Sequence, residues 1–139
     1  MTIYLNTKTL EYPLSEYDIR LQYPEVSFPE AFSPPDGFTR VTPSEQPTID
    51  GLTQTLREDF PIEVSGEWHQ RWSVVQLDLQ VASENVRNRR QALLQSSDWT
   101  QIPDSPVDKD AWATYRQALR DLTSQPGFPY SVVWPQAPL

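Results

Sequence analysis

Residues 84–135 read ENVRNRRQALLQSSDWTQIPDSPVDKDAWATYRQALRDLTSQPGFPYSVVWP, and this stretch decides the fold of the C-terminal half. Apolar residues recur here and just upstream at spacings of three, four and seven, which is typical of amphipathic helices. The first helical pattern comprises Leu79, Ala82, Val86, Leu93 and Leu94. The second comprises Ala111, Trp112, Tyr115, Ala118, Leu119 and Leu122. The connector contains Pro103 and Pro106, which are poor helix-interior residues. The sequence therefore predicts a helical hairpin with Trp99 and Trp112 near its closed end, followed by an extended C-terminal tail.

Four motifs in this half follow one another in a fixed order. They are Ser97–Asp104 (SDWTQIPD), Ala111–Asp121 (AWATYRQALRD), Pro126–Pro129 (PGFP) and Trp134–Pro135 (WP). The ordered set resembles the phage tail assembly chaperone family, and tail fibre assembly proteins carry similar C-terminal segments. The N-terminal half resembles these proteins only loosely.

The resemblance implies a non-enzymatic protein that helps a phage tail fibre protein to fold, trimerise or attach. The implied partner is the fibre protein, through its C-terminal part, in the host cytoplasm during phage assembly. One alternative is a structural tail component that stays on the virion as a fibre cap or subunit. A second is a carbohydrate-binding tip, because exposed tryptophans can stack on sugars.

Composition limits the function independently of this resemblance. The chain of 139 residues carries a formal net charge of −8 and no cysteine. The negative charge disfavours nucleic-acid binding, because the chain repels phosphate. The absence of cysteine excludes disulfides and thiolate metal sites. No apolar run is long enough for a membrane span and no signal sequence follows Met1, so we expect a soluble protein that does not bind membranes.

Alternating apolar residues in residues 1–77 predict a small antiparallel sheet. The strand candidates are Thr2–Leu5, Lys8–Tyr12, Phe38–Val41, Leu52–Phe60 and Trp68–Leu77. Ser65 and Gly66 suit a turn, so the last two strands should form a hairpin at the centre of the sheet. A short helix over residues 16–22 should begin with Ser15 and Asp18 in a capping box.

Residues 26–38 form a proline-rich loop that also contains three phenylalanines, Phe28, Phe32 and Phe38. A polar linker would not need these rings, so we expect them to pin the loop on the sheet. The alternative is a proline-rich peptide that binds an aromatic groove of a partner.

Taken together, these patterns predict an α+β fold with a β-rich module at 1–77 and a helical-hairpin module at 78–139. The chain offers no recognisable catalytic, metal or cofactor site. His69 is the only histidine and has no nucleophile motif beside it. The acidic run around Asp108 lacks the pattern of a calcium loop, and Asp108 or Ser105 should instead cap the second helix.

The candidate partner-binding residues are Trp99, Trp112, Arg116, Arg120 and Trp134. Tryptophan and arginine dominate binding hot spots. We expect Tyr115 and Leu119 to point inward, and Arg116, Arg120 and parts of Trp134 to face outward. The alternative is structural: the tryptophans close a small core, and the arginines, including Arg87, Arg89 and Arg90, pair with carboxylates of Glu84, Asp98 and Asp121 or stack on tryptophan.

Overall fold

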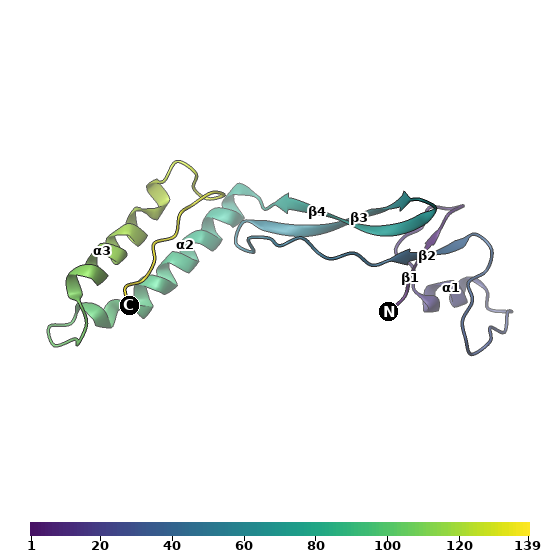
Figure 1. Cartoon of the computed structure of the whole chain (residues 1–139), viewed down its shortest axis with the longest axis horizontal. Coiled ribbons are helices and arrows are strands. Elements are labelled where there is room, and N and C mark those ends of the chain that lie inside the picture. Colours follow the sequence, from purple (N-terminus) through teal and green to yellow (C-terminus); the bar gives the residue numbers. More distant parts are fainter. The chain divides into compact units, whose positions relative to one another are not determined.

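The computed structural model describes residues 1–139 and confirms an α+β fold (Figure 1). Its strands are β1 (Ile3–Asn6), β2 (Phe38–Thr42), β3 (Gln54–Val64) and β4 (Glu67–Gln76). Its α-helices are α1 (Glu16–Gln22), α2 (Leu79–Ser96) and α3 (Lys109–Arg120). Two short 3₁₀ helices, η1 (Asp98–Gln101) and η2 (Asp121–Ser124), follow α2 and α3. None of the helices combines the length and the apolar character that crossing a membrane requires.

The chain divides into two compact units. The first, here called the N-terminal unit, comprises Met1–Thr48 and Leu56–Ser73. The second, here called the helical unit, comprises Ile49–Thr55 and Val74–Leu139. Strands β3 and β4 each contribute residues to both units. That residues 1–77 and 78–139 form separate modules stays a prediction.

The strands form one four-stranded sheet in the order β1-β2-β4-β3. Strands β1 and β2 are antiparallel, as predicted, with Ile3 opposite Val41. Strands β2 and β4 pair in parallel, with Val41 opposite Trp68, so the sheet is mixed rather than wholly antiparallel. The predicted hairpin is present, but β3 is an edge strand rather than central. The reason is that β4, the second strand of the hairpin, pairs with β2 and leaves β3 at the edge. Because β3 and β4 run in opposite directions, pairing through β4 rather than β3 makes the contact with β2 parallel.

The hairpin turn forms where the sequence predicted it. Ser65 and Gly66 both have positive φ, 52° and 83°. Two-residue hairpin turns of the favoured type require this conformation at both positions, and glycine adopts it without a steric cost.

The predicted strand over residues 8–12 is wrong. The Asn6 side chain accepts hydrogen bonds from the backbone of Lys8 and Thr9, at 2.9 and 3.1 Å, and so stabilises a turn. Leu14 then makes an isolated antiparallel bridge with Tyr4. The predicted helix that follows is confirmed as α1, with the Ser15–Asp18 capping box complete.

Aromatic rings form much of the core of the N-terminal unit. Tyr4, Ile19 and Phe38 are buried, and Phe32 of the proline-rich loop packs against them. The Phe32 and Tyr4 rings meet edge to face with centroids 5.6 Å apart. The guanidinium of Arg20 lies 5.0 Å from the Phe32 ring centroid, a cation–π contact that also holds the loop.

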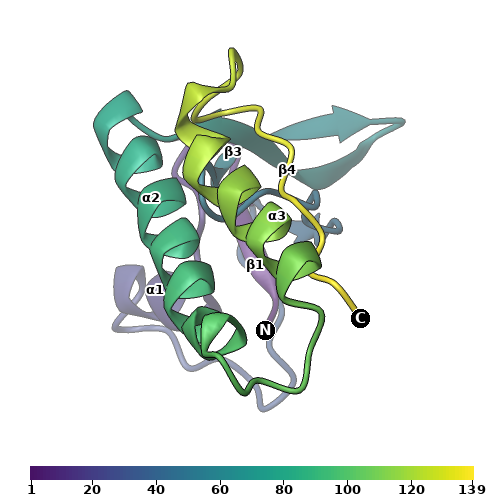
Figure 2. The same cartoon turned by 90° about the vertical axis from the view of Figure 1, so that its left-hand side faces the viewer.

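Helices α2 and α3 form the predicted hairpin, and the C-terminal segment runs along them (Figure 2). Tyr115, Leu119 and Leu122 are buried as expected. Asp108 caps α3 by accepting a hydrogen bond from the backbone of Ala111 at 3.0 Å. Leu79 was expected on the apolar face but is 61% exposed at the first residue of α2. Helix packing begins one turn later, at Ala82.

Candidate functional site

Arg116 is buried and joins the two helices of the hairpin. Its Nη1 donates hydrogen bonds to the Leu94 carbonyl at 2.6 Å and to Ser97 Oγ at 2.7 Å. Its Nη2 donates to Asp98 Oδ1 at 2.7 Å. The last carbonyls of a helix lack intrahelical partners, and a guanidinium can satisfy them. The expectation that Arg116 faces outward is therefore wrong.

The sequence did contain a signal for this position. Arg116 follows Trp112 by four residues and precedes Leu119 by three, so it lies on the apolar face of α3. An arginine on such a face is buried only when its donors find partners, and here all three partners come from the end of α2 or the residues after it.

Trp99 and Trp112 meet at the closed end of the hairpin, as predicted. Their ring centroids are 6.3 Å apart, and Trp112 also contacts Tyr115 edge to face at 5.5 Å. Trp112 is half-buried, whereas Trp99 is 48% exposed. Trp112 therefore acts as a core residue that closes the hairpin. Trp99 packs against it but leaves part of its indole exposed to solvent.

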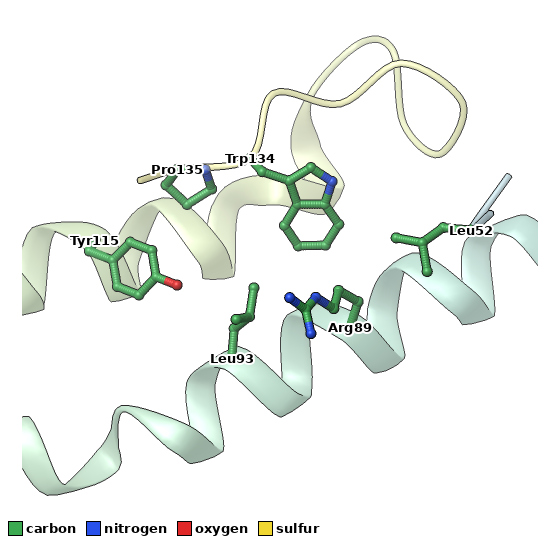
Figure 3. Close-up of a pocket in the computed structure, with 6 residues that line it drawn as sticks. All are labelled: Leu52, Arg89, Leu93, Tyr115, Trp134 and Pro135. Atoms are coloured by element: carbon green, nitrogen blue, oxygen red, sulfur yellow. The ribbon is translucent and has the colours of Figure 1, made fainter. Parts of the chain in front are cut away.

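A pocket with a cavity volume of about 320 Å³ lies between α2, α3 and the C-terminal segment. Figure 3 shows Arg89 and Leu93 of α2 pointing toward Trp134 and Pro135 of the C-terminal segment. The complete lining is Leu52, Arg89, Leu93, Tyr115, Trp134 and Pro135. Of the predicted site residues, only Trp134 lines the pocket.

Leu52 was missed because nothing in the sequence links it to the helices. The Asn85 side chain donates a hydrogen bond to the Leu52 carbonyl at 2.9 Å and so ties the segment before β3 to α2. The backbone N–H of Leu77, which follows β4, donates a hydrogen bond to the Thr53 carbonyl at 2.8 Å. These long-range contacts form only when the helical unit folds.

The PGFP motif and the residues after it position Trp134. The Gln125 side chain donates to the Val133 carbonyl at 2.9 Å and accepts from the Val133 backbone at 2.8 Å. The Tyr130 hydroxyl donates to the Leu77 carbonyl at 2.7 Å. A Cβ atom at Gly127 would lie 2.0 Å from the Ser131 carbonyl oxygen, so this close turn requires glycine.

Most arginines of the helical unit lack a carboxylate partner. The only ion pair in this unit is Arg116–Asp98. Arg87 lies over the Phe128 ring at 5.2 Å, and the buried Nε of Arg90 has no hydrogen-bond partner. Arg89 and Arg120 are exposed. The interpretation that arginines pair with Glu84, Asp98 and Asp121 is confirmed for Asp98, which binds Arg116. It is wrong for Glu84 and Asp121, which bond instead with Gln80 and Gln117.

The titratable groups with altered pKa values lie in the N-terminal unit. Burial, reinforced by a hydrogen bond with Glu58, raises the pKa of the Tyr12 hydroxyl. Hydrogen bonds from Ser73 and Arg57 lower the pKa of Asp59. His69 Nε2 lies 3.8 Å from a Glu67 carboxylate oxygen. No group of three or more His, Asp or Glu side chains is arranged to hold a metal ion.

Comparison with known proteins found one family model that matches the C-terminal part of the chain. Residues 83–139 match the model of the family described as phage tail assembly chaperone protein. The resemblance seen in the four motifs is thereby confirmed over this range. The match supports a role in phage tail assembly and a phage tail protein as partner. No curated protein and no solved structure matches the chain significantly.

Proposed function

We propose that this chain is a tail fibre assembly chaperone, which binds a phage tail fibre protein and promotes its folding, trimerisation or attachment. The observation that carries the proposal is the match of residues 83–139 to the tail assembly chaperone family. It covers the hairpin, the pocket and the C-terminal segment, apart from the start of α2 and Leu52.

The helical unit has surfaces suited to a polypeptide partner. Trp99 and Val133 are 48% and 78% exposed, and Arg89 and Arg120 have no ion pair. Exposed tryptophans and free arginines are the residue types that contribute most to binding energy. Trp99, Arg120 and Trp134 therefore remain our candidates for fibre contacts, whereas Trp112 and Arg116 act from inside the hairpin.

The physical task of such a chaperone is to cover surfaces that a fibre exposes before it assembles. Chains dominated by non-local β pairing fold slowly and leave strand edges and apolar surface open to aggregation. A protein that binds the assembly-competent state raises its population by mass action. No bond is made or broken in this role, and it would take place in the host cytoplasm during phage assembly.

Co-expression tests the proposal directly. The tail fibre gene of the same phage is expressed alone, with this chain, and with an unrelated acidic protein of similar size as control. We expect soluble, trimeric fibre only when this chain is present, measured by size-exclusion chromatography with light scattering. An equal yield of trimer in all three expressions would contradict the proposal.

A second measurement separates an assembly factor from a retained tail component. Quantitative mass spectrometry of purified virions should find the fibre protein without a fixed number of copies of this chain. A fixed stoichiometry in virions would favour the structural alternative.

A further inference from the structure

Four side chains give the pocket of the helical unit apolar walls. They are Leu52, Leu93, Trp134 and Pro135, and each is only half-buried. Their remaining apolar surface is therefore open to an incoming group. The cavity volume of about 320 Å³ is at the small end of the range for ligand pockets, and it suits one large side chain.

Two polar groups face the same space. Figure 3 shows the Arg89 guanidinium beneath the indole of Trp134 and the Tyr115 hydroxyl directed toward Leu93. Arg89 has no carboxylate partner within the chain. A guanidinium presents several donors in a fixed plane, which matches the geometry of a carboxylate. The pocket thus combines an apolar cavity with a free donor for an anion at its edge.

The charge of Arg89 contrasts with that of the chain as a whole. Arg87 and Arg90 lie on the same helix, but neither lines the pocket, and Arg87 lies over the Phe128 ring. The chain as a whole carries a net charge of −8, so an acidic peptide is not attracted to its surface in general. Attraction of such a peptide must therefore come from Arg89, the arginine that lines the pocket.

We propose that this pocket binds an acidic segment of the partner polypeptide, with an apolar or aromatic side chain inserted against Leu93 and Trp134 and a neighbouring carboxylate on Arg89. The inference rests on the proposed function only in assigning that segment to a phage tail protein. The position of Trp134 is set in advance by the bonds between Gln125 and Val133, so little ordering is needed on binding.

The test uses the full chain, labelled with ¹⁵N, and three capped peptides in NMR titrations. The first is acetyl-Gly-Asp-Phe-Glu-Gly-amide, the second replaces both acids with lysine, and the third replaces phenylalanine with glycine. We expect the first to shift the amide signals of Leu52, Arg89 and Leu93 and the indole signal of Trp134. A Kd near ~1 mM is expected for so short a peptide. The other two peptides should bind much more weakly.

Two matched arginine variants test whether Arg89 supplies the positive charge that binds the acidic peptide. Arg89→Gln should weaken binding of the acidic peptide about fivefold or more, because it removes the carboxylate partner. Arg40→Gln removes the same charge from an exposed position on β2 and should leave the Kd unchanged. Both residues are exposed, so both variants should fold.

Four results would overturn the inference: no shift at the pocket, equal binding of the lysine peptide, equal binding of the glycine peptide, or equal loss in both variants. Pocket signals that move on dilution without peptide would overturn it too, because a second copy of the chain would then be the occupant. Failure here leaves the co-expression result unaffected, so the pocket and the chaperone role are tested separately.

Discussion

Replacing Arg116 by alanine should destabilise the helical unit, because this residue is only 8% exposed. The change deletes a buried hydrogen bond to Ser97 Oγ and partly buried ones to the Leu94 carbonyl and Asp98. The Asp98 side chain is 65% exposed, so water replaces most of that bond. Each of the other two bonds from this charged donor is worth about 1–2 kcal/mol, so we expect a loss of about 2–4 kcal/mol.

Urea denaturation followed by circular dichroism at the helical band measures this loss. The midpoint of Arg116→Ala should fall at an unchanged slope, which reports a loss of stability rather than of cooperativity. Arg116→Lys keeps the charge but not the planar fork, so its midpoint should lie between those of wild type and Arg116→Ala. Asp98→Asn should cost about 0–1 kcal/mol, because Asp98 is exposed.

The matched control is Arg120→Ala, which removes an exposed arginine without an ion pair near the end of the same helix. Its stability should stay within about 0.5 kcal/mol of wild type. If Arg116→Ala and Arg120→Ala have the same midpoint, the buried arginine does not hold the hairpin together. If Arg116→Ala keeps wild-type stability but no longer binds the fibre, its role is recognition after all.

Leu119→Ala should lower stability by about 2–5 kcal/mol in thermal melting, because Leu119 is fully buried; a loss below about 1 kcal/mol would show that the site is open. Gly127→Ala should loosen the C-terminal segment and speed its limited proteolysis, because its Cβ would meet the Ser131 carbonyl; Gly51→Ala, with nothing within 4 Å, should not. Hydrogen bonds from Ser15 lower the pKa of Asp18 below its ordinary value of 3.8. The stabilising effect of the Asp18 carboxylate on α1 is therefore complete above pH 3.8 and is lost as the pH falls through the folded-state pKa. In Asp18→Asn, the free energy of unfolding should fall less steeply with decreasing pH in this range. The same dependence of unfolding free energy on acidic pH in Asp18→Asn and wild type would contradict this.

Local signals predicted the elements of this fold well. The capping box at Ser15 and the cap at Asp108 use side chains within three residues of the groups they bond, so sequence alone locates them. The turn at Ser65 and Gly66 likewise depends on the conformations that these two residues adopt. Hydrophobic spacing found both long helices because one face of each is apolar.

What the sequence could not predict depends on contacts between distant residues. Either strand of the hairpin could have paired with β2, and the choice of β4 made the sheet mixed. Leu52 joined the pocket through a hydrogen bond from Asn85, thirty-three residues along the chain. Arg116 was assigned to the surface because arginine is rarely buried, whereas the end of α2 supplies its acceptors.

The central claim is that the helical unit binds a tail fibre protein. Hydrogen–deuterium exchange of the chain, free and in a complex with co-expressed fibre protein, tests it most directly. We expect slower exchange in the complex at residues 89–93 of α2 and 132–136 of the C-terminal segment, with little change in residues 1–48. Protection confined to residues 1–48, or no complex at all, would contradict the claim.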